Sequence, residues 1–473
     1  MHVHLIGVAG TGMGSLAGLL RAAGHRVTGS DRAFDPPMGP ALERWGVETI
    51  VGYDAKNLEP APDLVVVGNV CRKDHPEAAA AIERGLRVST FPHTLAELFL
   101  GDRVPLVVAG THGKTTTSTL LAYLLERTGK HPGMLLGGVP VDFDTSFAIG
   151  RPGGPFVIEG DEYDTAFFEK TPKLWHYRAH AAILTSVEHD HIDIYPTLES
   201  YRAAFVRFVR DLPEDGLLVA WAGSPEVRAV AKEARCRVVY YALSTDETAD
   251  ADVTWLAAPI QSSAGWQPFE LFIGGSATPR IVSPLSGAHN VLNATAAMAL
   301  AAEATRAPLD GLIGALRTFG GVRRRQELIG DANGVLVYDD FAHHPTAVRE
   351  TLSGLRKRHA NARLICAFEP RSATASRALH QQAYVEAFDD CDLAILAPVG
   401  RPEIAKEERL DTSALARRIT ERGTQAEAPE TLDAVLARIV DVARKGDVVV
   451  LMSNGAFGGL HEKLLSALAV RDL

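Results

Sequence analysis

Short apolar runs alternate along the chain with stretches in which apolar residues recur every three or four positions. The first pattern is typical of buried strands and the second of amphipathic helices. Strands that alternate with helices in this way pair in parallel, so the sequence predicts an α/β fold. The strands are expected at residues 3–8, 64–68, 104–109, 156–158, 181–185, 335–338, 364–368, 393–397 and 448–452.

The chain has 473 residues, which is too long for a single hydrophobic core. The order of the predicted strands and helices divides it into three units. We expect a Rossmann-like N-terminal domain at 1–100, a P-loop ATPase domain at 101–318 and a Rossmann-like C-terminal domain at 319–473.

The chain carries 48 Lys and Arg against 58 Asp and Glu, a formal net charge of −10. This excess of negative charge does not favour binding to nucleic acid or to an acidic membrane surface. The four cysteines are widely spaced and form no CxxC motif, so we expect reduced thiols. The N-terminus has no signal-peptide pattern, and no apolar run is long enough to span a bilayer. These features predict a cytoplasmic protein.

The apolar run at 104–109 leads into a glycine loop, GTHGKTTT at 110–117, and leucines at helical spacing follow. A strand, a glycine loop, a Lys-Thr pair and a helix bind phosphate, because backbone N–H groups point at the phosphate oxygens. Lys114 would neutralise the terminal phosphates, and the Thr115 hydroxyl would be a ligand of Mg²⁺. The usual pattern has glycine at 108, where this chain has Val108. The alternative is an ordinary helix start at a glycine turn.

Acidic residues and a histidine follow the next apolar strands. Glu159 and three further acids come directly after the run 156–158, where an acid of a P-loop fold completes the Mg²⁺ shell. His191 lies in an acidic segment after the run 181–185 and is a candidate metal ligand or orienting group. The alternatives are an acidic turn on the surface and a structural histidine.

The N-terminal strand leads into the stretch GVAGTGMG at 7–14, and the second strand ends in Ser30 and Asp31. This is the first βαβ unit of a dinucleotide-type fold, in which glycines admit a phosphate and the acid bonds a ribose or base. Ser15 stands where the third glycine of the pattern is expected. Asn69 follows a further strand, at the edge where ligands of α/β sheets gather. The alternative is that the glycines serve only helix packing.

Polar residues also mark a helix start near residue 288 and the strand ends of the third unit. Asn290 and Asn293 lie on one face of this helix, where they would bond a purine edge or cap the helix with buried amides. An arginine run at 323–325 lies at the junction of the second and third units, where it faces either a nucleotide or solvent. Polar residues that follow strands of the third unit are Asp340, His344, Arg371, Ser372, Ser453 and Asn454.

Across essentially the whole chain, these three units resemble the Mur ligases of peptidoglycan synthesis. The stretch GTHGKTTT is similar to the ATP loop of that family. The histidine at 112 in this loop resembles the loop of the branch that acts on UDP-N-acetylmuramate. The resemblance implies ATP and Mg²⁺, with the metal held by Thr115, Glu159 and His191. It implies catalytic roles for Lys114, Glu159, His191 and His344. It implies that ATP contacts Gly110, Thr111, His112, Gly113, Lys114, Thr115, Thr116, His289, Asn290, Asn293, Arg325 and Asp340.

Three stretches, at 159–170, 367–372 and 452–460, are similar to the branch of this family that uses a peptide. That branch joins the lactyl carboxylate of UDP-N-acetylmuramate to the amine of L-Ala-γ-D-Glu-meso-diaminopimelate through an acyl phosphate. It releases ADP and phosphate and serves cell-wall recycling. Gly160 and Ala456 depart from the usual residues by exchanges between small side chains.

The same resemblance implies the substrate contacts. The peptide is expected at Arg371, Ser372, Ser453 and Asn454. The UDP-sugar is expected at Gly10, Thr11, Gly12, Met13, Ser30, Asp31, Asn69 and His112. We expect a monomer or a weak homodimer.

Three other classes of protein share part of this pattern. The L-alanine-adding branch of the family resembles the first two units, but it has a shorter segment before the histidine and lacks the ending at 452–460. An NAD-dependent dehydrogenase fits the N-terminal glycines but has no use for a second phosphate loop at 110. A nucleotide-binding regulator without catalysis leaves the roles of Glu159 and His191 unexplained.

Overall fold

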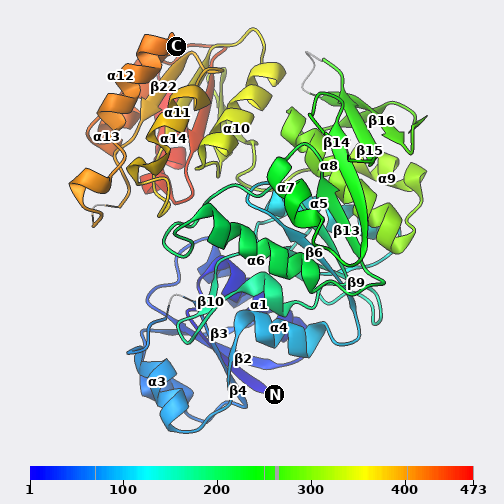
Figure 1. Cartoon of the computed structure of the whole chain (residues 1–473). Helices are drawn as coiled ribbons and strands as arrows, with labels where there is room; N and C mark the ends of the chain where they lie inside the picture. Colours follow the sequence, from blue (N-terminus) through cyan, green and yellow to red (C-terminus); the bar gives the residue numbers. More distant parts are fainter. Residues whose placement is uncertain (70, 250, 262–265, 402, 472–473) are drawn as a thin grey trace.

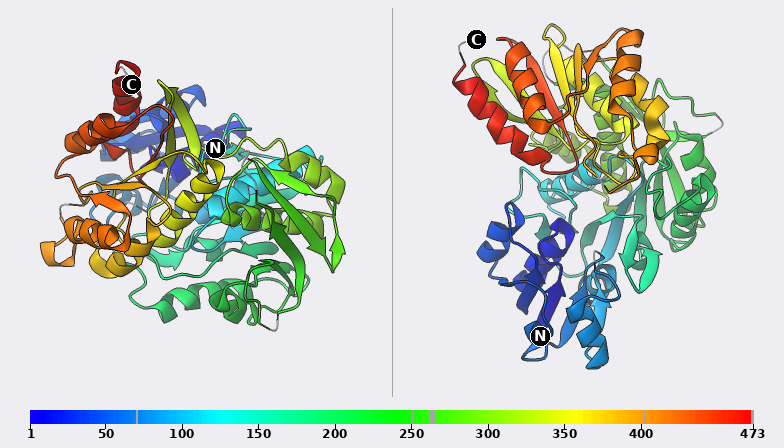
Figure 2. Two further views of the ribbon diagram at one scale, coloured as in Figure 1. Left: turned by 90° about the horizontal axis from the view of Figure 1, so that it is seen from above. Right: turned by 90° about the vertical axis from the view of Figure 1, so that its left-hand side faces the viewer.

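The computed structural model of the chain describes residues 1–69, 71–249, 251–261, 266–401 and 403–471. Three large β-sheets follow one another along the sequence, and helices cover them (Figure 1). Figure 2 shows the first and third units at opposite ends of the molecule, with the central unit between them. The predicted α/β fold of three units is confirmed. Because each range contains one large sheet, we propose domain boundaries at 1–100, 101–318 and 319–473.

The first sheet is parallel throughout, with the strand order β3-β2-β1-β4-β5. The order reverses between β1 and β4, and a ligand of such a sheet binds at the carboxyl ends of these strands. The strands are β1 (His2–Ile6), β2 (Arg26–Asp31), β3 (Glu48–Val51), β4 (Leu64–Val67) and β5 (Val88–Thr90). The helices are α1 (Thr11–Ala22), α2 (Met38–Arg44), α3 (Pro76–Glu83) and α4 (Phe91–Phe99), with the 3-10 turn η1 (Ala55–Leu58).

The central sheet has the order β17-β16-β15-β14-β13-β12-β6-β9-β7-β8, and β18 also pairs with β16. Strand β6 lies between β12 and β9 and is parallel to both, so the loop after β6 lies beside their carboxyl ends. The strands are β6 (Val104–Ala109), β7 (Gly133–Leu135), β8 (Phe147–Ala148), β9 (Pro155–Gly160), β12 (Ala181–Leu184), β13 (Leu217–Trp221), β14 (Arg237–Leu243), β15 (Val253–Pro259), β16 (Gln267–Ile273), β17 (Ser276–Ala277) and β18 (Ile281–Ser283).

Helices and one hairpin complete the central unit. A two-stranded hairpin lies outside the sheet and consists of β10 (Asp164–Ala166) and β11 (Glu169–Pro172), followed by the turn η2 (Lys173–His176). The helices are α5 (Lys114–Arg127), α6 (Leu198–Arg210), α7 (Pro225–Ala231), α8 (Ala288–Thr305) and α9 (Leu309–Leu316). No helix among the described residues is long and apolar enough to cross a membrane.

Strand β9 is longer than the sequence predicts. Its pairing with β6 continues through Val108↔Glu159 and Ala109↔Gly160, so Glu159 lies inside the strand and not after it. A side chain at Gly160 would crowd this pairing, because a Cβ there would lie 2.7 Å from Cγ1 of Val107. The segment of acids beyond the strand therefore begins at Asp161.

The third sheet has the order β19-β20-β24-β21-β22-β23. Only the edge strand β19 is antiparallel to its neighbour, so the ends of β20, β21 and β24 meet at one edge. The strands are β19 (Glu327–Ala332), β20 (Val335–Asp340), β21 (Leu364–Phe368), β22 (Leu393–Leu396), β23 (Gln425–Glu427) and β24 (Val448–Met452). The helices are α10 (Pro345–Arg358), α11 (Gln381–Ala387), α12 (Thr412–Arg422), α13 (Leu432–Val442) and α14 (Leu460–Ala469), with the turns η3 (Ala378–His380), η4 (Lys406–Glu408) and η5 (Phe457–Gly459).

The first two units share a hydrophobic core, whereas the third unit has cores of its own. One buried cluster combines residues of α1 and α4 with residues of α6 and one face of the central sheet. The two clusters of the third unit contain only residues between 332 and 468. Apolar burial therefore holds the first unit against the second, while the third unit is free of such a constraint.

Small residues of α1 permit this shared core. A Cβ on Gly18 would lie 2.3 Å from the ring of Phe147 in β8. Ser15, which replaces the third glycine of the N-terminal pattern, places its Oγ 2.7 Å from Oγ of Ser146. The departure from the glycine pattern thus has a structural reason, since the serine forms a polar contact between the two units.

Replacement of Gly18 should separate these units. We expect Gly18→Ala to lower the free energy of unfolding by about 1–3 kcal/mol, because the added methyl group overlaps Phe147 and Trp45. The matched control is Gly314→Ala in α9, where a Cβ has open space. The control should raise stability by about 0.5–1 kcal/mol, since alanine favours a helix over glycine. Urea unfolding measures both, and stabilisation by both variants would contradict the packing.

Candidate active site

The loop after β6 is held in one shape by its two glycines. Gly110 has a φ of +133° and Gly113 a φ of +79°, conformations that side chains disfavour. A Cβ on Gly110 would lie 2.2 Å from Oγ1 of Thr185, and one on Gly113 would lie 2.6 Å from Oδ1 of Asn293. Thr185 also donates a hydrogen bond of 2.6 Å to the carbonyl of His112. The neighbouring strand β12 thus fixes the loop on one side.

The valine at 108 is explained by the strand. Val108 is fully buried and pairs with Ile183 on one side and Glu159 on the other. The turn toward the phosphate region begins only at Gly110, so no glycine is required two residues earlier.

Lys114 is the first residue of α5, and its ammonium lies inside the loop. Its Nζ donates to the carbonyl of Gly110 at 2.6 Å and to Oε2 of Glu162 at 2.8 Å. Burial by itself would lower the pKa of Lys114, but the carboxylates of Glu162, Asp161 and Glu159 outweigh burial and raise it. The lysine is therefore charged and aimed at the centre of the loop.

Glu162 was not among the predicted site residues, yet it forms the centre of this arrangement. Its side chain is 1% exposed and also accepts a hydrogen bond of 3.1 Å from the hydroxyl of Tyr201. Burial would raise the pKa of Glu162, but Lys114 and His191 together lower it to about 2. The only signal in the sequence was its place in the acidic segment after β9.

Thr115 and Glu159 come together as expected for a magnesium site. The Thr115 hydroxyl donates to Oε1 of Glu159 at 2.8 Å, and the Gly137 N–H donates to Oε2 at 3.0 Å. Burial and the nearby Asp161 raise the pKa of Glu159. The Thr115 hydroxyl and the Glu159 carboxylate are hard oxygen donors, which fit Mg²⁺.

His191 contacts Glu162 and not the pair of Thr115 and Glu159. Its Nε2 is 3.4 Å from Oε1 of Glu162, and its backbone is left-handed with a φ of +51°. Burial opposes the charged imidazole, but Glu162 and Asp190 raise the pKa of His191. Thus His191 and Lys114 both contact the carboxylate of Glu162, whereas Thr115 contacts the carboxylate of Glu159.

A cavity of about 350 Å³ opens beside the loop, between α5, α8 and the start of the third unit. Among the predicted ATP contacts, it is lined by His112, Gly113, Thr115, Thr116, His289, Asn290, Asn293, Arg325 and Asp340. Apolar and aromatic side chains, among them Trp221, Tyr241 and Leu243, form another part of the wall. Phosphate-binding and apolar surfaces thus lie side by side in one cavity, which suits a purine nucleotide.

The two asparagines of α8 are partly engaged with the protein itself. Asn290 Nδ2 donates to the carbonyl of Ser286 at 2.8 Å, and Asn293 Nδ2 donates to Oδ1 of Asn290 at 3.2 Å. Asn293 Oδ1 accepts from the Thr117 hydroxyl at 3.1 Å. These contacts match the alternative of buried amides that order the helix start. Both asparagines nevertheless line the cavity, as does His289, whose Nδ1 is 3.6 Å from Glu350.

Arg325 joins the third unit to the phosphate loop. Its Nη2 donates to the Thr115 hydroxyl at 3.4 Å, and its guanidinium lies 4.9 Å from the centre of the Phe341 ring. Asp340, at the end of β20, accepts from the N–H groups of Gln326 at 2.7 Å and Ala342 at 2.8 Å. Of the arginine run, Arg325 therefore faces the cavity and Asp340 orders the backbone beside it.

A second contact between the units involves histidines. His344, the N-cap residue of α10, has its ring centre 4.6 Å from that of His112. Glu188 lies between the units, with Oε2 3.2 Å from Nε2 of His112 and 2.7 Å from the hydroxyl of Thr346. Burial and the neighbouring His112 lower the pKa of His344 to about 3, so its imidazole is neutral. The sequence did not single out Glu188.

Thr111 faces the central unit and not the cavity. Its hydroxyl donates to the carbonyl of Glu188 at 3.0 Å and lies 3.0 Å from the hydroxyl of Tyr201. Its side chain therefore braces the loop, and its backbone N–H donates to the carbonyl of Ser186 at 3.0 Å.

The predicted peptide contacts lie at the open edge of the third sheet. Arg371 is about half exposed and its Nη1 is 3.5 Å from Oε1 of the buried Glu369. Ser453 donates its hydroxyl to the same carboxylate. Ser372 accepts from the Ala375 N–H at 3.0 Å. Oδ1 of Asn454 is buried, and the described residues offer it no hydrogen-bond partner.

Apart from His112, which belongs to the phosphate loop, the predicted UDP-sugar contacts lie in the first unit. The turn of Gly10, Thr11 and Gly12 is exposed, Asn69 is exposed, and Met13 is buried beneath them. A Cβ on Gly68 would lie 2.8 Å from the carbonyl of Ile6 and 3.7 Å from Met13, so β1 and β4 meet closely here. These elements form the topological switch point of the sheet.

Ser30 and Asp31 have internal partners. The Ser30 hydroxyl is buried and donates to Oε2 of Glu77 at 2.5 Å, and its contact with the UDP-sugar stays a prediction. Asp31 accepts from the Ala9 N–H at 2.8 Å and from the Tyr53 hydroxyl at 2.9 Å. Asp31 thus holds the glycine turn in place and keeps part of its surface exposed.

Three family models match the chain in succession. The model described as "Mur ligase family, catalytic domain" matches residues 2–103, "Mur ligase middle domain" matches 108–301, and "Mur ligase, glutamate ligase domain" matches 324–455. The chain therefore belongs to the Mur ligase family, and the resemblance inferred from the sequence is confirmed.

Individual relatives are similar along their whole length. The UDP-N-acetylmuramate–L-alanyl-gamma-D-glutamyl-meso-2,6-diaminoheptandioate ligase of Escherichia coli is 39% identical over 99% of this chain and 98% of that protein. A UDP-N-acetylmuramate–L-alanine ligase of Roseiflexus is 34% identical over 96% of both. The crystal structure of a murein peptide ligase from Psychrobacter arcticus has a TM-score of 0.73 and 36% identity, and covers 100% of both chains.

The pH dependence of unfolding should report the pair of Lys114 and Glu162. Because the pKa of Glu162 is lowered, its contribution to stability is full above its ordinary pKa of 4.5 and is lost as the pH falls toward about 2. The whole shift corresponds to roughly 3 kcal/mol. Between about pH 5 and about pH 3, the wild type should lose about 2 kcal/mol more than Glu162→Gln in urea unfolding.

The control for this experiment is Glu126→Gln. Glu126 is 42% exposed and lies 3.0 Å from the exposed His131, so its removal should leave the wild-type pH dependence unchanged. If Glu162→Gln also kept the wild-type slope, the buried ion pair would not contribute to acid stability.

Proposed function

We propose that this chain is an ATP-dependent ligase that joins the lactyl carboxylate of UDP-N-acetylmuramate to the amine of L-Ala-γ-D-Glu-meso-diaminopimelate. The products are the amide, ADP and phosphate, and the physiological role is recycling of cell-wall peptide. The observation that carries the proposal is the cavity between the central and third units, where Thr115 and Arg325 meet beside apolar walls. The family membership and the names of the relatives support it.

The choice of a peptide over free L-alanine rests on two observations. The relatives named for the tripeptide reaction are 39% and 35% identical over 99% of this chain, whereas the L-alanine ligase of Kineococcus radiotolerans is 41% identical over 80% of it. The segment between the acidic motif and His191 contains the hairpin β10–β11 and the turn η2. This segment is shorter in the alanine-adding branch. Both observations favour the peptide.

The first chemical step is phosphoryl transfer to the muramate carboxylate. A carboxylate is a poor acyl donor, and ATP converts it to an acyl phosphate. Lys114 offsets the negative charge that builds up on the transferred group, and Arg325 adds a second cation beside Thr115. Mg²⁺, when bound by Thr115 and Glu159 with His191 nearby, supplies further charge neutralisation and orients the phosphates.

The second step is attack of the peptide amine on the acyl carbon. The third unit has to bring this amine to about 3 Å from the carbon, so its position relative to the phosphate loop controls the reaction. Glu188 connects His112 of the loop to Thr346 of α10, and this contact is suited to hold the units in a closed arrangement. His344 stays neutral at physiological pH and offers an unprotonated nitrogen beside this contact.

We further propose that the protein is cytoplasmic and is a monomer or a weak homodimer. The four cysteines are buried and form no disulfide among the described residues, which suits a reducing compartment.

The direct test offers the two amine substrates separately. With ATP, Mg²⁺ and UDP-N-acetylmuramate, we expect phosphate release with the tripeptide at a kcat/KM at least about 100-fold above that with L-alanine. A difference of this size corresponds to about 2.7 kcal/mol, within reach of two or three charged hydrogen bonds to the distant peptide groups. Equal or greater use of L-alanine would overturn the proposed substrate, and phosphate release with neither would overturn the proposed reaction.

Arg371→Lys should impair use of the tripeptide. Arg371 is half exposed at the sheet edge, and its planar guanidinium can bind a peptide carboxylate through two hydrogen bonds. Lysine keeps the charge and loses this fork, so we expect a loss of about 1–3 kcal/mol in kcat/KM for the peptide. The KM values for ATP and UDP-sugar should not change.

Arg422→Lys is the matched control, because Arg422 makes an internal ion pair with Asp389 at 2.8 Å on the surface of the same unit. It should leave the peptide KM unchanged. If Arg371→Lys lowered the melting temperature and left the peptide KM unchanged, Arg371 would serve only its contact with Glu369.

A further inference from the structure

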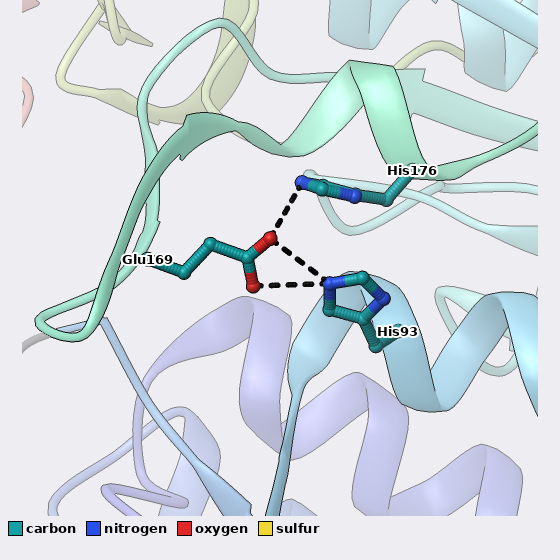
Figure 3. A group of neighbouring side chains, drawn as sticks. All are labelled: His93, Glu169 and His176. Atoms are coloured by element: carbon teal, nitrogen blue, oxygen red, sulfur yellow. Dashed lines mark hydrogen bonds and ion pairs between the residues drawn. The ribbon is translucent and has the colours of Figure 1, made fainter.

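Two histidines and a glutamate meet where the first unit contacts the central unit (Figure 3). His93 belongs to α4 of the first unit, Glu169 begins β11, and His176 ends η2. Figure 3 shows both imidazoles pointing toward the carboxylate of Glu169 from opposite elements. None of these three residues belongs to the candidate active site.

The distances between these groups are those of metal ligands. His93 Nε2 lies 3.1 and 3.0 Å from the two oxygens of Glu169, and His176 Nε2 lies 3.5 Å from Oε1. All ligand atoms of the group lie within 4.8 Å of one another. Two ligands that bind one tetrahedral zinc ion at about 2.0–2.1 Å are about 3.3 Å apart. Both imidazole nitrogens thus lie from Glu169 at about the spacing that a shared ion requires.

We propose that His93, Glu169 and His176 form a binding site for a borderline divalent cation of the zinc type, separate from the magnesium site. Two imidazole nitrogens and one carboxylate favour Zn²⁺, Co²⁺ or Ni²⁺ over Mg²⁺, which prefers oxygen ligands. Three protein ligands leave a fourth position for water, and His93 is 46% exposed, so the ion enters from solvent.

Thr171 is the group that the ion displaces. Its hydroxyl lies 2.8 Å from Nε2 of His176 and 3.4 Å from Oε1 of Glu169. When an ion occupies the imidazole nitrogen, the hydroxyl keeps the carboxylate as its partner. This contact orients Glu169 toward the ion.

The position of the site gives the ion a structural role. Glu169 and His176 lie in the segment that begins at the acidic motif of the central unit, and Phe167 at the turn of the hairpin packs on a core cluster of the first unit. Lys173 of the same segment lies 5.1 Å from the centre of the Phe91 ring in α4 and 3.5 Å from Asp161. A bound ion therefore fastens the first unit to the segment that carries the active-site acids. The inference does not depend on the proposed reaction.

The test measures metal binding to the full-length protein after removal of metals by a chelator. Co²⁺ is titrated in the presence of excess Mg²⁺ and followed by its visible absorption, and Zn²⁺ binding is counted by equilibrium dialysis. We expect His93→Ala and Glu169→Gln to bind one ion fewer than the wild type, or to bind it at least about tenfold more weakly. Zn²⁺ should also raise the melting temperature of the wild type more than that of either variant.

His131→Ala is the matched control, because His131 forms an exposed pair with Glu126 that contains a single histidine. It should retain the wild-type number of ions. A difference from the wild type is required, since His112, Glu188 and His344 form a second group with metal-ligand spacing. Unchanged ion number and affinity in Glu169→Gln, which keeps the shape of the side chain, would overturn the site even if His93→Ala failed to fold.

Discussion

The buried contact between Lys114 and Glu162 is the interaction on which the active-site arrangement depends. Glu162 is almost fully buried, and it remains charged because the ammonium lies 2.8 Å away and the imidazole of His191 lies 3.4 Å away. This pair ties the phosphate loop after β6 to the segment after β9, and the contact of Glu162 with His191 adds the segment after β12. Three strand ends are therefore held together by one carboxylate, and a ligand that attracts Lys114 has to compete with it.

Apolar contacts hold the first unit against the second, and polar contacts hold the third unit against the second. The first and second units share a continuous core, in which α1 lies close enough to β8 to exclude a side chain at Gly18. The third unit meets the second through Arg325, the Glu188 contacts and the rim of the cavity. Polar contacts of this kind are weaker and more reversible than a shared core. The third unit is therefore held less firmly than the first.

The segment from Asp161 to His176 connects the phosphate loop to the first unit. At one end it carries acids that face the phosphate loop, and at the other it contacts α4 through Lys173 and the group of His93, Glu169 and His176. A change in the position of the first unit is thereby linked to the acids around Lys114. The predicted UDP-sugar contacts of the first unit and the predicted ATP contacts are separate in the fold, and this segment is a short physical connection between them.

The sequence by itself determined the α/β fold, the phosphate loop and the pairing of Thr115 with an acid of β9, because hydrophobic periodicity and glycine spacing are local properties. It also led to the family, through motifs that occupy strand ends. It did not determine the partners of individual side chains. Glu162 and Glu188 became central, and Ser30 turned inward to Glu77, because strands distant in the sequence place them together. Likewise, His93 and His176 belong to different units, so only tertiary packing could bring them to one carboxylate.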